Sequence, residues 1–192
     1  MVITMQEILY INACVRKESR TERLAQYLLR KLQKPYQEVK LESLSFPKVD
    51  EAFLQKRDSL IQQNSFDDPS FALAREFSKA RIIVIAAPFW DLSFPAALKQ
   101  YFELINVLGI TFTYSKDGIP VGMCNAKKLY YITTAGGFIP CDEYGFGYIK
   151  ALAESFYQIP QIELIKAAGL DIVGADVGSI LLNTEKTIDD LI

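Results

Sequence analysis

The chain has 192 residues, of which 50% are hydrophobic and 23% are charged, and this composition is typical of one globular domain over residues 1–192. It contains no histidine, which excludes Ser-His-Asp triads, Cys-His dyads and His-ligated zinc or haem. The 21 basic and 23 acidic side chains nearly balance, so we expect neither a nucleic-acid-binding face nor a polybasic membrane patch. An enzyme of this composition would take its chemistry from a cofactor or from carboxylates.

The sequence indicates neither a membrane segment nor a secretion signal. The longest apolar run, residues 82–90, is about half as long as a bilayer-spanning helix. Residues 1–7 lack the basic region, apolar region and cleavage site of a signal peptide. The three cysteines, Cys14, Cys124 and Cys141, are odd in number and widely spaced, which favours reduced packing residues. We therefore expect a cytoplasmic protein without disulfides or a metal site.

The N-terminal part of the chain alternates strand and helix patterns. Residues 8–13 form an apolar run that predicts the first strand. Ser19 and Glu22 form an S-x-x-E capping box, which predicts a helix beginning at Arg20. Residues 37–41 alternate apolar and charged side chains, as an edge strand does. The apolar stripe of the helix consists of Leu24, Ala25, Leu28, Leu29 and Leu32.

The rest of the chain continues this alternation. Residues 81–87 are rich in β-branched side chains and apolar on both faces, which predicts a central parallel strand. Pro95 and Gly109 bound the next helix, since proline is favoured at a helix start and glycine just past its end. Asp142 is expected to cap a helix that ends near residue 157. The other expected elements are helices over residues 51–63, 69–79 and 184–191, strands over 128–133 and 161–167, and a hairpin-like excursion over 111–123.

Strands that alternate with helices predict an α/β protein in which helices cover both faces of a parallel sheet. In such sheets, ligands bind beyond the carboxyl ends of the strands, where the strand order reverses. Three loops follow predicted central strands: residues 12–21, 88–95 and 133–141. We expect these loops to form one site.

Loop 12–21 has neither the G-x-G-x-x-G pattern of dinucleotide-binding folds nor the G-x-x-x-x-G-K-[ST] pattern of P-loop NTPases. It carries the hydroxyls of Ser19 and Thr21, the cation of Arg16 and the free amides of a helix N-terminus. These are the parts of a phosphate site. The alternative is a solvated turn in which Ser19 only caps the helix.

The other two loops suit a flat ligand. Loop 88–95 reads P-F-W-D-L-S-F-P and holds three aromatic residues. Aromatic side chains in a surface loop are expected to cover a planar ligand or a partner chain. The alternative is that they form a small core under the loop. Loop 133–141 carries Gly136 and Gly137, which allow the backbone to come close to a ligand. Together the three loops favour a mononucleotide such as FMN over a dinucleotide.

Four motifs carry a resemblance to a known family. Residues 15–21 keep an arginine and two hydroxyls, and residues 88–92 read P-F-W-D-L before a helix whose first turn ends in L-K. Residues 111–118 read T-F-T-Y-S-K-D-G, and residues 134–137 read T-A-G-G. In this order the motifs resemble those of the flavodoxin-like NAD(P)H:quinone oxidoreductases, particularly the FMN-dependent azoreductases.

The resemblance implies a flavodoxin-like three-layer sandwich whose five-stranded parallel sheet has the order 2-1-3-4-5. It implies FMN with its phosphate on the first loop, its ring against residues 88–92 and its pyrimidine side near residues 134–137. It also implies a homodimer that passes a hydride from NADH or NADPH through FMN to quinone, azo or nitro compounds by a ping-pong mechanism. It names no catalytic side chain. The implied cofactor-binding residues are Arg16, Ser19, Thr21, Pro88, Phe89, Trp90, Asp91, Leu92, Thr134, Ala135, Gly136 and Gly137.

Two departures from the family pattern leave alternatives open. Asp91 stands where the family has asparagine, and its side chain either faces the flavin ring or turns away. Ala135 stands where the family has arginine, which removes that cation. The alternative functions are a flavodoxin-type electron carrier, an ancillary or regulatory subunit, and a mononucleotide-binding protein without turnover. Tyr114, Tyr144 and Tyr148 are candidates for a proton donor by residue type alone.

Overall fold

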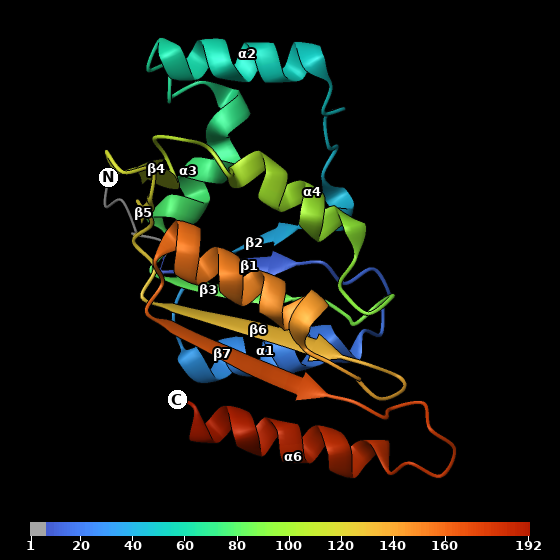
Figure 1. Ribbon diagram of the computed structural model, residues 1–192. Helices are drawn as coiled ribbons and strands as arrows, with labels where there is room; N and C mark the ends of the chain where they lie inside the picture. The colour runs from blue at the N-terminus through green and yellow to red at the C-terminus, as the bar shows by residue number, and fades with distance from the viewer. Residues whose placement is uncertain (1–6) are drawn as a thin grey trace.

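The computed structural model describes residues 7–192, whose centre is a parallel sheet of five strands (Figure 1). The order of its strands is β2-β1-β3-β6-β7. When only these five strands are numbered, the order is 2-1-3-4-5, which confirms the prediction. The strands are β1 (Ile8–Asn12), β2 (Tyr36–Lys40), β3 (Ile82–Ala86), β6 (Lys128–Thr134) and β7 (Gln161–Ala167).

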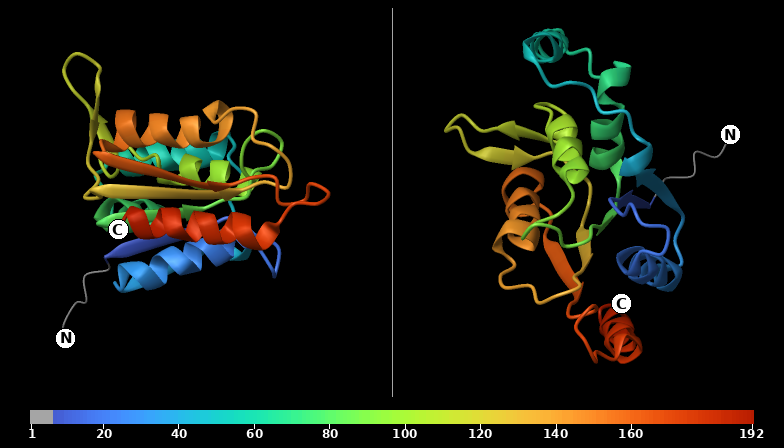
Figure 2. Two further views of the ribbon diagram at one scale, coloured as in Figure 1. Left: turned by 90° about the horizontal axis from the view of Figure 1, so that it is seen from below. Right: turned by 90° about the vertical axis from the view of Figure 1, so that its right-hand side faces the viewer.

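Helices cover both faces of the sheet (Figure 2), as the alternation of patterns predicts. On one face, α1 (Arg20–Leu32) and α6 (Val177–Asp190) pack on the even-numbered side chains of β1, such as Ile8 and Tyr10. On the other face, Leu9 and Ile11 point toward the remaining helices. These are α3 (Ala72–Lys79), α4 (Ala96–Ile105) and α5 (Tyr148–Leu152).

Helix α1 begins at Arg20, as predicted, but only half of the expected capping box forms. The Ser19 hydroxyl accepts a hydrogen bond from the Glu22 amide at 3.2 Å. The Glu22 carboxylate accepts instead from the side-chain amide of Asn12 at 3.1 Å, and this amide also donates to Glu38 at 2.8 Å. The buried Asn12 therefore joins the end of β1 to α1 and β2.

Two of the cysteine thiols, those of Cys14 and Cys124, are shielded from solvent, Cys14 fully and Cys124 partly. Cys14 follows β1 and is 2% exposed, and burial raises the pKa of its thiol to about 11. Burial likewise raises the pKa of the Cys124 thiol to about 12. Both groups therefore stay protonated near neutral pH and act as packing side chains.

One predicted helix start is confirmed in position and one is wrong. Asp142 precedes the helical segment that ends at residue 157, as predicted, but its carboxylate accepts no capping hydrogen bond and pairs instead with Lys166 of β7 at 2.7 Å. Wide π-type turns, Glu143–Gly147 and Ala153–Tyr157, flank α5 on both sides. Helix α6 begins at Val177 rather than near residue 184, since Asp176 accepts a hydrogen bond from the Ser179 amide at 3.0 Å and caps it.

Helix α2 (Glu51–Gln62) lies apart from the sheet at the top of Figure 1, and none of its residues is buried. Asp50 caps its start. A short 3₁₀ turn, Pro69–Phe71, precedes α3, so the predicted helix over residues 69–79 begins with a tighter turn.

No helix within residues 7–192 is long and apolar enough to cross a membrane. The expectation about a signal peptide concerns residues that lie almost entirely outside the described part of the chain.

The predicted hairpin is present. Strands β4 (Phe112–Tyr114) and β5 (Pro120–Gly122) pair in antiparallel fashion and project from the body, as both views of Figure 2 show. The base of the hairpin packs tightly, because a Cβ atom on Gly122 would lie 2.4 Å from the carbonyl oxygen of Tyr157. Gly122 therefore permits the hairpin to contact the C-terminal end of the 143–157 helical segment.

We predict that Gly122→Ala lowers the free energy of unfolding by about 2 kcal/mol, because the added methyl group meets backbone that cannot move aside. Gly137→Ala is the control, since its Cβ would meet no atom within 4 Å. Urea denaturation of both variants measures the effect. Equal stability of the two variants would show that the hairpin is not packed as described.

Candidate functional site

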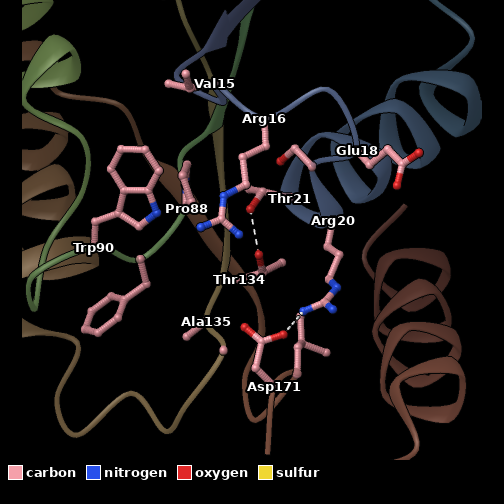
Figure 3. Close-up of a pocket in the computed structure, with 14 residues that line it drawn as sticks. Val15, Arg16, Glu18, Arg20, Thr21, Pro88, Trp90, Thr134, Ala135 and Asp171 are labelled. Atoms are coloured by element: carbon pink, nitrogen blue, oxygen red, sulfur yellow. Dashed lines mark hydrogen bonds and ion pairs between the residues drawn. The ribbon is translucent and has the colours of Figure 1, made fainter.

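A pocket of about 320 Å³ lies at the carboxyl edge of the sheet (Figure 3). Four segments line it: the loop after β1 with the start of α1, the loop after β3, the end of β6 with its loop, and the loop after β7. The first three are the predicted loops. They meet because all strands of a parallel sheet end at the same edge.

Most of the residues predicted to bind the cofactor line this pocket. The structure does not bring Asp91, Leu92 or Gly137 into its lining. Val15, Glu18, Arg20, Leu170 and Asp171 line it without having been predicted. The predicted residues in the lining are Arg16, Ser19, Thr21, Pro88, Phe89, Trp90, Thr134, Ala135 and Gly136.

One side of the pocket is suited to an anion. Because Ser19 is the N-cap of α1, the amides of Arg20 and Thr21 have no acceptor within the helix. The side chain of Arg16 extends into the pocket (Figure 3) and pairs with no carboxylate of the described residues. An unpaired guanidinium beside a helix N-terminus is a favourable arrangement for a phosphate group.

A hydrogen bond between two hydroxyls forms the floor of the pocket. The Oγ1 atoms of Thr21 and Thr134 lie 2.7 Å apart, and both residues are buried. Thr21 belongs to α1 and Thr134 ends β6, so this bond joins the helix to the carboxyl end of β6. The two predicted hydroxyls are therefore held together at a defined place.

The aromatic wall is built on a tight turn after β3. The Phe89 amide donates to the Thr134 carbonyl at 2.9 Å, which fixes the start of the loop against β6. Trp90 and Ser93 exchange two backbone hydrogen bonds at 3.1 and 2.7 Å, while Asp91 and Leu92 between them have φ values of 50° and 66°. This is the geometry of a type I′ turn. It leaves the Asp91 and Leu92 side chains exposed and Trp90 beside the pocket (Figure 3).

The tyrosines considered as proton donors lie elsewhere. Tyr114 and Tyr144 are 50% and 56% exposed, and Tyr148 packs against Phe94 and Phe102 with ring centroids 5.6 and 6.1 Å away. None of them lines the pocket. Within residues 7–192 no cluster of three or more His, Cys, Asp or Glu side chains could hold a metal ion.

The loop after β7 is the segment that sequence reasoning missed. The amides of Leu170 and Asp171 donate to the carbonyls of Ala135 and Gly136 at 3.2 and 2.8 Å, so this loop runs beside loop 133–141. Asp171 also pairs with Arg20 Nη1 at 2.7 Å. The available signal was the position of residues 168–171, which directly follow a predicted strand just as the other three loops do.

Gly136 also has a packing role that was not predicted. A Cβ atom at this position would lie 2.2 Å from Oδ2 of Asp171 and 3.2 Å from its Cβ. A side chain at this position would displace the Asp171 carboxylate, so glycine allows the loop after β7 to pack closely here. Its role toward a ligand stays a prediction. Gly137 is exposed and would meet nothing within 4 Å.

Comparison with known families gives the same fold. The profile of the Flavodoxin-like fold family matches residues 6–167 of the chain. The chain belongs to this family. The matched part includes every strand of the sheet and three of the four segments that line the pocket, whereas the loop after β7 and α6 lie beyond it.

Relatives with assigned names cover nearly the whole chain. It is 33% identical to an FMN-dependent NADH:quinone oxidoreductase of Coprothermobacter proteolyticus, over 97% of this chain and 98% of the relative. It is 37% identical to FMN-dependent NADH:quinone oxidoreductase 2 of Clostridium acetobutylicum, over 94% of each. These identities place the chain among the flavodoxin-like oxidoreductases, as the sequence motifs indicated.

Solved structures agree on the fold. A crystal structure of an azoreductase from Bacillus anthracis has a TM-score of 0.82 at 19% identity, covering 97% of this chain and 98% of that one. An FMN-dependent NADH-azoreductase from B. anthracis in complex with FMN has a TM-score of 0.80 at 21% identity, covering 97% of both chains. At these identities the likeness shows the three-layer architecture alone.

We predict that Leu92→Gly raises the free energy of unfolding by about 1 kcal/mol, because glycine adopts the left-handed conformation without the strain that a branched side chain meets. Leu92 is 49% exposed, so little packing is lost. Leu92→Ala is the control, since it shortens the side chain but keeps the strain. Thermal unfolding compares them, and a glycine variant no more stable than the alanine variant would contradict the strained turn.

Proposed function

We propose that this chain is an FMN-dependent NADH:quinone oxidoreductase whose active site is the pocket at the carboxyl edge of the sheet. The observation that carries the proposal is one pocket that joins an anion site, made by Arg16 and the N-terminus of α1, to an aromatic wall at Phe89 and Trp90. A flat ring system that bears a phosphate would use both parts, the anion site for its phosphate and the aromatic wall for its ring. The relatives, which match nearly the full chain, are named FMN-dependent NADH:quinone oxidoreductases. We take FMN as the cofactor and NADH as the reductant from these names.

The residues of the chain fit FMN part by part. Arg16, Ser19 and the free amides of α1 would hold the phosphate. The hydroxyls of Thr21 and Thr134 would face the chain that links phosphate and ring. Pro88, Phe89 and Trp90 would cover the ring, and residues 134–137 would lie along its pyrimidine side. When bound, FMN supplies the hydride relay that no side chain of this protein can provide.

The exposed Asp91 side chain places no charge inside the described pocket. Its contribution to FMN would therefore come through the backbone of the type I′ turn. Ala135 offers a small buried surface where the family has arginine. The cofactor site is consequently built from hydroxyls, amides and one unpaired guanidinium, and a chain without histidine can supply all of these.

The overall reaction converts NADH, a proton and a quinone into NAD⁺ and a hydroquinone. Two electrons and one proton leave NADH as hydride, and the acceptor takes up that hydride and one further proton. Because no tyrosine lines the described pocket, we infer that solvent supplies the second proton. Nicotinamide and acceptor would use the same open face in turn, which is a ping-pong mechanism. NADPH could replace NADH, and azo or nitro compounds could replace quinones.

We also infer that the protein acts as a homodimer in the cytoplasm. Large apolar side chains are exposed around the pocket, including Trp90 at 39%, Phe138 at 81% and Tyr144 at 56%. Helix α2 buries none of its residues in the monomer. A second copy that covers part of this surface would remove apolar area from water and narrow the pocket.

We predict that Arg16→Ala weakens FMN binding by about 10- to 100-fold, because a charge-assisted hydrogen bond to phosphate is lost. Fluorescence titration of the protein with FMN measures the dissociation constant. Lys17→Ala is the matched control, since Lys17 is adjacent but does not line the pocket. If both variants bind FMN like the parent, the phosphate does not lie at Arg16.

Steady-state kinetics test the reaction sequence. With FMN present, NADH oxidation should depend on a quinone, and double-reciprocal plots at several quinone concentrations should be parallel. Turnover also separates an oxidoreductase from an electron carrier, because a carrier does not accept hydride from NADH. Intersecting lines would contradict the ping-pong order, and absence of turnover with bound FMN would contradict the assignment as an oxidoreductase.

Sedimentation measures the oligomeric state. We expect a dimer of the 21.7 kDa chain, and we expect Phe138→Ser to shift it toward monomer because the largest exposed aromatic surface is lost. Leu182→Ser is the control, since Leu182 is 55% exposed on α6 but does not line the pocket. A monomeric parent protein at micromolar concentration would refute the dimer.

A further inference from the structure

Asp171 places a carboxylate in the wall of a pocket that otherwise suits an anion. Its backbone amide donates to the Gly136 carbonyl at 2.8 Å, and its side chain lies against Gly136, where a Cβ atom would meet Oδ2 at 2.2 Å. The loop after β7 therefore fixes the position of this carboxylate. A negative charge there would repel a bound phosphate if nothing compensated it.

Arg20 compensates this charge. Its Nη1 atom lies 2.7 Å from Oδ1 of Asp171, and both residues line the pocket. Figure 3 shows the pair at the opposite end of the pocket from Trp90. Arg20 is the first residue of α1, so the pair also lies beside the helix amides that would bind the anion. The two side chains are 39% and 63% exposed, so water weakens their field without abolishing it.

The other charges of the pocket are arranged differently. Arg16 extends into the pocket without a carboxylate partner, and the Glu18 carboxylate extends away from Arg16. With the Arg20–Asp171 pair neutral, Arg16 and the helix dipole attract an anion at the helix N-terminus, and Glu18, whose carboxylate extends away from Arg16, is the other charged side chain of the lining. Loss of Arg20 alone would expose Asp171 to the ligand and cancel much of this attraction.

We propose that Arg20 is a specificity-determining residue: by neutralising the Asp171 carboxylate, it lets the pocket prefer a phosphorylated flavin over an unphosphorylated one. This proposal rests on the proposed function, since it assumes that the pocket binds a flavin. Arg20 acts by neutralising the Asp171 carboxylate, which the backbone hydrogen bond from the Asp171 amide to the Gly136 carbonyl places at the pocket. Neither residue is assigned a step in hydride transfer. Arg20 determines, through Asp171, how well the phosphorylated ligand is bound.

The test compares FMN with riboflavin, because the two share a ring and a ribityl chain and differ in the phosphate. Fluorescence titrations give both dissociation constants for the parent and for Arg20→Gln, Asp171→Asn and the double variant. We expect Arg20→Gln to weaken FMN roughly three- to tenfold and to leave riboflavin unchanged. We expect Asp171→Asn to bind FMN at least as tightly as the parent, since Arg20 is then a second free cation.

The double variant is the decisive measurement. Removal of the carboxylate that Arg20 neutralises should restore FMN affinity to within about twofold of the parent. The loss in Arg20→Gln should also shrink in roughly 1 M salt, where charges are screened over about 3 Å. Arg23→Gln is the matched control one turn along α1, because Arg23 pairs with Glu185 of α6 and does not line the pocket. It should change neither constant.

A purely structural role of the Arg20–Asp171 pair would give a different pattern of dissociation constants. If the pair only held the loop after β7 in place, each single variant would weaken FMN and riboflavin equally, and the double variant would be no better than either. That result would overturn the proposal and leave the proposed function standing. A parent protein that binds neither flavin would remove the basis for both.

Discussion

The hydrogen bond between the Thr21 and Thr134 hydroxyls connects the two structural units on which the pocket depends. One is the N-terminus of α1, whose free amides and capping Ser19 form the anion site. The other is the carboxyl end of β6, whose Thr134 carbonyl also accepts from Phe89 and so fixes the aromatic wall. The two buried hydroxyls satisfy each other at 2.7 Å, and the helix start, strand end and turn are thereby held in one arrangement.

The parts of the fold that local chemistry determines were predictable from the sequence. Ile82–Ala86 is apolar on both faces because helices cover both sides of β3, and such a run has few other structural solutions. Ser19 caps α1 because its hydroxyl is the acceptor that the Glu22 amide needs. The three predicted loops meet because parallel strands end at one edge, so a correct strand assignment was enough to bring most of the pocket together.

The features that depend on long-range partners were not predictable in this way. Asp142 looked like a helix cap, but Lys166 lies near it only once β6 and β7 are paired. The close packing at Gly136 comes from Asp171, which is distant in sequence and close only through the loop after β7. For Asp91 the sequence left two side-chain orientations open, and in the structure this side chain is exposed on the left-handed turn.

The absence of histidine is consistent with a site whose reactive atoms belong to a bound flavin. The side chains of the pocket bind and place charge: an unpaired guanidinium at Arg16, a carboxylate at Asp171 that Arg20 neutralises, a second carboxylate at Glu18, a pair of hydroxyls and an aromatic wall. Such a site can hold a phosphorylated ring and leave one face open to nicotinamide and acceptor in turn. The chemistry of the proposed reaction then requires no acid or base from the chain itself.

The most direct test of this account is anaerobic addition of NADH to the purified protein carrying bound FMN, followed by its visible absorbance. The account predicts that the oxidised-flavin band is lost on mixing and returns when a quinone is added. A protein that binds FMN but keeps this band in excess NADH would contradict the central claim that the pocket is the active site of an NADH-dependent oxidoreductase.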